Sequence, residues 1–250
     1  MRLVFATETL ALNWFLEPVP SEGGTGSGSI IDRRGYILTN YHVVEKAYKV
    51  HINLSDGTQF DGEVIGKDPE NDLAVVKFDP QGKELVTIPF GDSSNLKVGQ
   101  KVLAIGNPFG LAHTLTTGIV SALDREIANE GQTTIRGLVH TDAAINPGNS
   151  GGALVDMNGR LIGINTAIFS RSGGSNGIGF AIPVNMARSV MDSLIHSGQV
   201  VRGWLGVQVE QLAGPSTQTR RQGLLRIGVA ARCPSGTSRS SSDSSSQLAR

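Results

Sequence analysis

Ser150 lies in a glycine-rich stretch, residues 146–152 (NPGNSGG), whose composition could support nucleophilic catalysis. Glycines on both sides of a serine favour a tight turn, because glycine adopts backbone conformations that other residues avoid. Such a turn can present the Ser150 hydroxyl outward and direct the backbone N–H groups of Gly148 and Ser150 at one point. Two converging N–H donors stabilise the oxyanion that forms in acyl transfer. The same composition is also typical of an ordinary turn between strands, so the partners of Ser150 must decide between the two interpretations.

A histidine and an aspartate elsewhere in the chain could activate this serine. A serine hydroxyl becomes an effective nucleophile when a base removes its proton and a third group orients that base. His42 follows an apolar run typical of a strand, and Asp72 precedes a second such run, which could carry its side chain towards the interior. A histidine that only fills a strand end is the ordinary alternative. We adopt that alternative for the other four histidines: His51, His113, His140 and His196.

Taken together, these stretches resemble the HtrA/Deg family of trypsin-fold serine proteases, in its bacterial form. The matching segments are residues 26–32 (GSGSIID), 39–44 (TNYHVV), 71–74 (NDLA), 104–110 (AIGNPFG), 141–152 (TDAAINPGNSGG) and 177–183 (GIGFAIP). The likeness runs in order from about residue 25 to about residue 210. It implies that Ser150 is the nucleophile, His42 the general base and Asp72 the carboxylate that orients the imidazole. It also implies an oxyanion hole made by Gly148, Asn149 and Ser150, and a reaction that needs no metal or cofactor.

A second family also places a serine between glycines, and it has to be weighed. The stretch around Ser150 satisfies G-x-S-x-G, the nucleophile elbow of α/β-hydrolases. That fold requires a helix directly after the serine and the triad order serine, acid, histidine. Here the residues after Ser150 indicate a strand, an Asn158-Gly159 hairpin turn and a second strand. The only histidine downstream is His196, in a predicted helix. The observed order of histidine, aspartate and serine fits the chymotrypsin-type arrangement, so we reject the hydrolase alternative.

Short apolar runs separated by turns predict the strands that must position these residues. The expected first set lies at residues 2–7, 29–32, 36–39, 49–54, 59–66, 73–78 and 101–105, and the second at 114–122, 137–141, 153–156, 160–169 and 177–182. Residues 8–25, with their prolines and glycines, are expected to form a loop. The apolar spacing of residues 183–197 predicts a helix that Gly198 ends. The predicted fold class is all-β: two six-stranded antiparallel β-barrels of the trypsin-like serine protease fold, with a short C-terminal helix and a disordered tail.

The domain organisation follows from the same patterns. We expect a trypsin-like protease domain at residues 1–200, with its two barrels at about 1–110 and 111–200 and the reaction in the cleft between them. Residues 201–212 resemble the opening of the PDZ domain that follows the protease in HtrA-like chains. Residues 213–250, rich in serine and arginine, cannot bury enough apolar surface to order themselves, so we expect a disordered tail. A frameshifted or truncated C-terminus would explain this composition, and a natural extension is the alternative. At the N-terminus, the chain is either clipped or lacks the segments that the family has upstream.

Composition limits the classes of function. Lys and Arg total 22 and Asp and Glu total 22, so nothing indicates binding to nucleic acid or to an anionic membrane surface. No run approaches the roughly 18 apolar residues of a membrane span, and the first twenty residues make a poor signal peptide. The one cysteine, Cys233, can form neither a disulfide within the chain nor a cysteine-based metal site. The resemblance implies a protein of the cell envelope or periplasm and leaves homotrimer formation open.

Substrate preference can be inferred in part from the resemblance. In proteases that cut after Arg or Lys, an acid stands six residues before the nucleophile, and here that residue is Ala144. A cationic side chain would lack a counter-charge, so we expect cleavage after Val, Ala or Ile. The resemblance assigns substrate binding to one strand: Asn165, Thr166, Ala167 and Ile168. Pairing of this strand with an extended chain implies an unfolded polypeptide as substrate.

The sequence therefore predicts an ATP-independent serine endopeptidase that hydrolyses unfolded or misfolded proteins, a role in protein quality control. Residues 124–135 and 171–176 fall where the family has its mobile sensor and specificity loops. One alternative is a proteolytically inactive trypsin-fold protein that acts as a binding or chaperone-like module, and the presence of all three triad residue types argues against it. A damaged gene product that does not fold is the other alternative.

Overall fold

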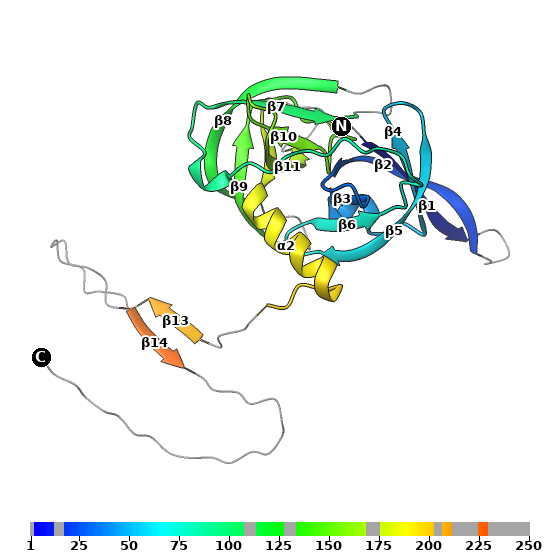
Figure 1. Ribbon diagram of the computed structural model, residues 1–250. Helices are drawn as coiled ribbons and strands as arrows, with labels where there is room; N and C mark the ends of the chain where they lie inside the picture. Colours follow the sequence, from blue (N-terminus) through cyan, green and yellow to red (C-terminus); the bar gives the residue numbers. More distant parts are fainter. Residues whose placement is uncertain are drawn as a thin grey trace, which may run out of the picture. The chain divides into compact units, whose positions relative to one another are not determined.

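The computed structural model contains a large unit, Met1–Val201, and a small one, Arg202–Arg250. The residues that the structure describes are 3–12, 18–107, 114–127, 134–168, 176–202, 207–211 and 225–229. The large unit consists of two closed antiparallel barrels of six strands each (Figure 1). The fold class expected from the sequence, two six-stranded barrels with one principal helix after them, is confirmed.

The first barrel holds six strands in the order β1-β2-β3-β6-β5-β4. Its strands are β1 (Leu3–Leu12), β2 (Pro18–Ile30), β3 (Tyr36–Thr39), β4 (Lys49–Leu54), β5 (Gln59–Asp68) and β6 (Leu73–Lys77). Strand β4 illustrates why these segments form strands, because Val50, Ile52 and Leu54 are buried and the residues between them are more exposed. That alternation matches the period of two that a strand with one face in the core requires. The inward-facing residues join one apolar cluster that fills the barrel.

The segment 8–25, which we expected to be a loop, is mostly strand. Strands β1 and β2 form a long hairpin in which Leu10 pairs with Pro20 and Leu12 with Pro18. Strand β1 pairs with β4 only as far as Glu8, and β2 pairs with β3 only at Ser29 and Ile30. Among the residues that the structure describes, no further strand pairs with the outer part of the hairpin, which therefore has a free edge on each strand. Pro18 and Pro20 are two residues apart, so both can direct their missing N–H towards the free edge, where proline removes no ladder hydrogen bond.

The second barrel has the strand order β10-β11-β12-β9-β8-β7. Its strands are β7 (Lys101–Gly106), β8 (Thr114–Ile127), β9 (Ile135–Thr141), β10 (Ala153–Val155), β11 (Leu161–Ile168) and β12 (Gly179–Pro183). Strand β7, which we grouped with the first set, pairs with β8 and β10 and belongs to this barrel. The boundary expected near residue 110 thus lies between β6 and β7. The sequence could not assign β7, because its alternating apolar residues would suit either barrel.

Helix α2 (Val184–Ser197) packs on both barrels. Its buried residues join a cluster that contains Leu73 of β6 and Leu161 of β11, so the helix holds the two barrels together. Gly198 ends the helix with a φ of 71°, a left-handed conformation that suits glycine, and its N–H donates to Leu194 O at 2.9 Å. The predicted helix at residues 183–197 is therefore confirmed to within one residue. No helix in the described ranges combines the length and the hydropathy required to cross a bilayer.

The small unit contains a two-stranded antiparallel sheet of β13 (Val207–Gln211) and β14 (Leu225–Val229). Strand β14 lies inside the segment 213–250 that we expected to be disordered, and β13 lies in the segment that resembles the opening of a PDZ domain. The remainder of the expected tail lies outside the described residues. The assignment of residues 201–212 to a PDZ domain stays a prediction.

Candidate active site

His42 and Asp72 are in direct contact in the first barrel. His42 lies in the short helix α1 (Tyr41–Val44), which follows β3, and Asp72 lies in the turn between β5 and β6. The His42 Nδ1 atom is 2.9 Å from Asp72 Oδ1 and 2.8 Å from Oδ2. The backbone N–H of His42 also donates to Asp72 Oδ1 at 3.0 Å. A carboxylate at Nδ1 favours the tautomer with its proton there, which leaves Nε2 free to accept a proton.

The backbone at Asp72 is held in an uncommon conformation. Its φ is 51°, in the left-handed region that aspartate tolerates better than most residues. The side chain of Asn40, which is fully buried, donates to Asp72 O at 2.8 Å and fixes this turn. Asp72 itself is 8% exposed, so its carboxylate is directed away from solvent and towards the imidazole. Asp72 directly precedes the apolar strand β6, as expected from the sequence, and this position brings its carboxylate into the interior.

Tyr41, which precedes His42, contributes to the electrostatics of the same helix. Its hydroxyl donates to Glu45 Oε1 at 3.0 Å. Burial raises the pKa of Tyr41, and the hydrogen bond to Glu45 raises it further.

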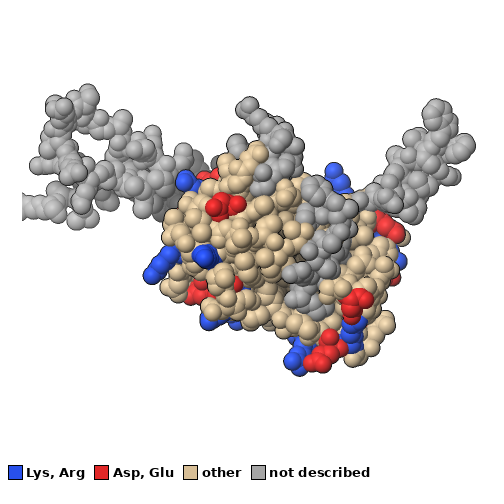
Figure 2. Space-filling view, turned by 90° about the horizontal axis from the view of Figure 1, so that it is seen from above, with Lys and Arg blue, Asp and Glu red and all other residues tan. Residues whose placement is uncertain are grey.

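On the face of the molecule shown in Figure 2, basic and acidic side chains of the described residues are separated by a large area without charged residues.

Ser150 lies in the loop between β9 and β10, and its neighbours fix the loop on both sides. Ser150 O accepts the N–H of Ser27 in β2 at 2.8 Å, and Gly151 N–H donates to Asn165 O at 2.8 Å. Gly151 has a φ of 81°, and a Cβ there would lie 2.2 Å from Ser27 O. This position therefore needs glycine both for its backbone conformation and for the close approach of the two barrels.

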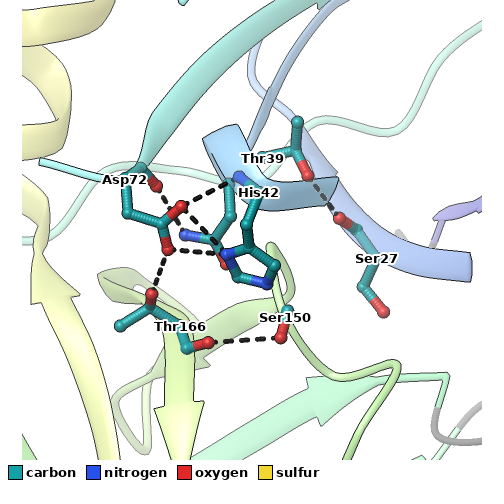
Figure 3. Close-up of polar contacts among 7 residues, drawn as sticks. Ser27, Thr39, His42, Asp72, Ser150 and Thr166 are labelled. Carbon is teal, nitrogen blue, oxygen red and sulfur yellow. Dashed lines mark hydrogen bonds and ion pairs between the residues drawn. The ribbon is translucent and has the colours of Figure 1, made fainter. Parts of the chain in front are cut away.

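Thr166 links the three predicted triad residues. Its hydroxyl donates to Asp72 Oδ2, and its backbone carbonyl accepts the Ser150 hydroxyl at 3.2 Å. Figure 3 shows the Ser150 side chain near the edge of the His42 ring that faces away from Asp72. We expected Thr166 only as part of the substrate strand and missed the contact of its hydroxyl with Asp72. The chain has no local signal for this contact, because the two residues are 94 positions apart.

His42 and Ser150 line the same cavity, which has a volume of about 360 Å³. Its walls come from α1 with the residues after it, the β1–β2 hairpin and the loop that carries Ser150: Thr7, Thr9, Gly24, Thr25, His42, Val43, Glu45, Lys46, Ala47, Pro147, Gly148 and Ser150. The N–H of Asn149 donates to Asn146 O at 2.9 Å. The N–H groups of Gly148 and Ser150 have no acceptor among the residues that the structure describes. These two donors are the pair that the sequence suggested for an oxyanion.

The strand expected to bind substrate combines buried and open positions. Asn165 is fully buried, its side chain donates to Ile105 O and Ala153 O at 3.3 Å, and its backbone supports the Ser150 loop. Ala167 and Ile168 pair with β12, whereas β10 pairs with β11 only as far as Ile164. Among the described residues, the other edge of β11 beyond this point carries no strand. Asn165 is thus a support for the loop, and the open edge lies after it.

Other predicted features of the site are only partly described. Ala144 O accepts the Thr116 hydroxyl at 2.9 Å, and Ala144 is partly buried. Of the expected mobile loops, residues 124–127 extend β8, while residues 128–133 and 171–175 lie outside the described residues. Within the described ranges, no cluster of three or more His, Cys, Asp and Glu side chains could hold a metal ion.

Comparison with known proteins supports one family. A family model described as a trypsin-like peptidase domain matches residues 26–164. Among curated proteins, "Protease Do-like 1, chloroplastic" from Arabidopsis thaliana is 48% identical over 214 residues, which cover 85% of this chain and 48% of the relative. A "Probable periplasmic serine endoprotease DegP-like" from Pseudomonas putida (strain W619) is 50% identical over 187 residues, which cover 75% of this chain and 38% of the relative.

Solved structures agree with this result. "HtrA-type protease AlgW with decapeptide" is 45% identical with a TM-score of 0.74, and the match covers 85% of this chain and 69% of that one. "HtrA-type protease AlgW with tripeptide" is 48% identical with a TM-score of 0.73, covering 84% of this chain and 65% of that one. This chain spans about half the length, or less, of the curated relatives it matches. From its fold and these similarities, the chain belongs to the HtrA/Deg family of trypsin-like serine proteases.

Proposed function

We propose that this chain is an ATP-independent serine endopeptidase that hydrolyses unfolded polypeptides, with Ser150, His42 and Asp72 as its catalytic triad. The observation that carries the proposal is the placement of His42 and Ser150 on one cavity, with the Asp72 carboxylate against His42 Nδ1. Nucleophile, base and orienting acid in this relation are the constellation that activates a serine.

The proposed reaction proceeds through an acyl-enzyme. The Ser150 hydroxyl leaves its hydrogen bond to Thr166 O and transfers its proton to His42 Nε2 as Oγ attacks the peptide carbonyl carbon. The N–H groups of Gly148 and Ser150 receive the oxyanion. The C–N bond then breaks, and the leaving amine takes the proton from Nε2. A water molecule then loses a proton to the same nitrogen and attacks the ester carbon. The bond from that carbon to Ser150 Oγ breaks, Oγ takes the proton back from Nε2, and the carboxylic acid product leaves.

The proposed substrate is an extended chain that pairs with the open edge of β11 at residues 166–168. A folded protein seldom offers a free strand, so the accessible substrates are unfolded or misfolded proteins, as protein quality control requires. Ala144 places no charge at the expected base of the specificity pocket, which favours cleavage after Val, Ala or Ile over cleavage after Arg or Lys. Homotrimer formation stays a prediction.

One observation favours a second candidate, a proteolytically inactive binding or chaperone-like protein. The Ser150 hydroxyl donates to Thr166 O at 3.2 Å, which describes a resting serine whose proton is not yet directed at the base. An inactive protein would keep this hydrogen bond, whereas an active enzyme exchanges it for one to His42 Nε2 when substrate binds.

Hydrolysis of one protein in two states tests the proposal. A disulfide-bonded protein and its reduced, carboxymethylated form are incubated with the chain without ATP, and the cleavage sites are mapped by mass spectrometry. We expect cleavage of the unfolded form alone, mainly after Val, Ala or Ile, and none with Ser150→Ala. Ser193→Ala is the matched control, because Ser193 is partly exposed on α2 and, among the residues that the structure describes, its hydroxyl bonds only Ser189 O of the same helix. Equal loss in both variants, or no cleavage by the unmodified chain, would contradict the proposal.

A further inference from the structure

We propose that Ser27, in the first barrel, is a positioning residue for the oxyanion hole of the second barrel. Its hydroxyl holds the peptide group between Gly148 and Asn149 and thereby sets the direction of the two N–H donors on either side. This inference rests on the proposed function, because the direction of these donors matters only if Ser150 attacks a carbonyl.

The Ser27 hydroxyl is buried, donates one hydrogen bond and accepts another. Ser27 is 1% exposed, and its Oγ donates to Gly148 O at 2.6 Å, across 121 positions of the chain. The same oxygen accepts the N–H of Asn107, directly after β7, at 2.9 Å. A buried hydroxyl with both a donor and an acceptor partner has one favoured orientation, because any rotation leaves a buried group unpaired.

The peptide that Ser27 holds lies between the two expected oxyanion donors. Its carbonyl belongs to Gly148 and is bound by Ser27, and its N–H belongs to Asn149 and donates to Asn146 O at 2.9 Å. Both ends of this peptide plane are therefore fixed. The preceding peptide carries the Gly148 N–H, and the following one carries the Ser150 N–H. Fixing the plane between them restricts the rotations that would turn one donor away from the other.

The backbone of Ser27 strengthens the same connection. Its N–H donates to Ser150 O at 2.8 Å. Its carbonyl accepts the Thr39 hydroxyl at 2.8 Å, a bond that Figure 3 shows. One residue of β2 thus holds two carbonyls of the catalytic loop, those of Gly148 and Ser150. Gly148 has a φ of 95°. Glycine can leave this backbone conformation for others at little cost, so the loop needs a restraint at this position.

Removing the hydroxyl should weaken transition-state binding more than substrate binding. Ser27→Ala removes the hydrogen bond to Gly148 O and the one from the Asn107 N–H, and the peptide plane is then held at one end only. Complete loss of one oxyanion donor lowers kcat by about 10²–10³-fold, so misdirection of a donor should lower kcat by about 10–10²-fold. KM should change less than about threefold, because the substrate carbonyl needs the donors mainly once it carries charge.

Thr141→Val is the matched control for this experiment. The Thr141 hydroxyl is also fully buried, donates to Ile119 O at 2.7 Å and accepts the N–H of Ala143 at 3.1 Å. Both variants therefore remove a buried hydroxyl that has one carbonyl and one N–H partner in the backbone. Only the Ser27 hydroxyl bonds to the peptide between Gly148 and Asn149, whereas the Thr141 hydroxyl bonds to Ala143, at the start of the same loop. Tm, kcat and KM are measured for both, together with the inhibition constant of a peptide boronic acid, whose adduct with Ser150 resembles the tetrahedral intermediate.

We expect similar losses of Tm in the two variants, with kcat and boronic-acid affinity falling in parallel only in Ser27→Ala. Ser27→Cys, which keeps a weaker donor of similar size, should give an intermediate kcat and carries the test if the alanine variant does not fold. Hydrogen exchange of the Asn149 amide should accelerate in the Ser27 variants alone. Hydrogen exchange can be measured whether or not the chain is active. If the chain is inactive but the Asn149 amide exchanges faster in the Ser27 variants, the proposed function is refuted and the restraint by Ser27 still holds. An active chain whose Ser27 variants keep kcat within twofold of Thr141→Val would overturn the inference.

Discussion

Replacing Asp72 with asparagine should inactivate the enzyme by reversing the tautomer of His42. Asp72 Oδ1 accepts the backbone N–H of His42 at 3.0 Å, and that group can only donate. The amide oxygen of asparagine must therefore take the Oδ1 position, and its NH₂ group must take the Oδ2 position. The Thr166 hydroxyl can rotate to accept from this NH₂ group. His42 Nδ1 is 2.9 Å from Oδ1 and 2.8 Å from Oδ2, so a proton on Nδ1 would face the amide N–H at the shorter contact, and we expect Nδ1 to become the acceptor of that N–H.

This exchange moves the ring proton to Nε2, the nitrogen that must accept the proton of Ser150. The expected loss of kcat is about 10⁴-fold, which corresponds to about 5.5 kcal/mol of transition-state stabilisation. The fold should survive, because asparagine tolerates the left-handed φ of 51° at this position as well as aspartate does. Steady-state kinetics on a fluorogenic peptide with Val before the cleaved bond measures kcat, and thermal unfolding verifies the fold.

Thr166→Val provides the comparison for this prediction. It removes one hydrogen bond to the Asp72 carboxylate without changing the tautomer of His42. A hydrogen bond to a charged group contributes about 1.5–3 kcal/mol, which limits the loss to about 10–150-fold. The reasoning is refuted if Asp72→Asn keeps kcat within tenfold of the unmodified chain, or if Thr166→Val is the more damaging of the two.

Three further predictions concern the supports of the site. Gly151→Ala should abolish peptidase activity, because its Cβ would lie 2.2 Å from Ser27 O; normal kcat would show that the loop is free to move. Leu194→Ala should lower the free energy of unfolding by about 2–5 kcal/mol in urea titrations, because this fully buried residue belongs to the cluster between the barrels; a change below about 1 kcal/mol would contradict that role. Hydrogen bonds, first of all from Asn185, lower the pKa of Asp92 from 3.8 to about 2. Its contribution to stability is therefore present above the unfolded-state pKa and is lost as the pH falls through the folded-state pKa. Asp92→Asn should lower Tm at pH 7, and most of the difference should be gone near pH 2; a difference independent of pH would refute this.

Elements whose signal lies in consecutive residues could be predicted from the sequence, and those that depend on distant segments could not. Strands β3 and β4 have the bounds that we expected, because consecutive residues carry the signal: burial alternates along β4, and β3 is a short run with three buried residues in a row. The β1–β2 hairpin was missed, because Pro18 and Pro20 indicate a loop unless one knows that they lie at a free edge. The assignment of β7 failed for a similar reason, since a strand's partner depends on segments far away in the chain.

The residues of the candidate site show the same difference between local and long-range signals. His42 and Asp72 could be selected from residue type and the apolar runs beside them, and their contact at 2.8 Å agrees with that selection. The hydroxyl contacts of Thr166 and Ser27 could not be selected, because each joins residues about a hundred positions apart and a lone Ser or Thr has no distinctive pattern. Only the folded arrangement of the two barrels brings these groups together.

Labelling with a fluorophosphonate probe, followed by peptide mapping, tests the triad most directly. We expect a single adduct on Ser150, absent from Ser150→Ala and formed at least about a hundredfold more slowly in His42→Ala, because the hydroxyl needs a base to become nucleophilic. A chain that is folded and yet forms no adduct, or that labels Ser150 at the same rate without the imidazole of His42, would contradict the account.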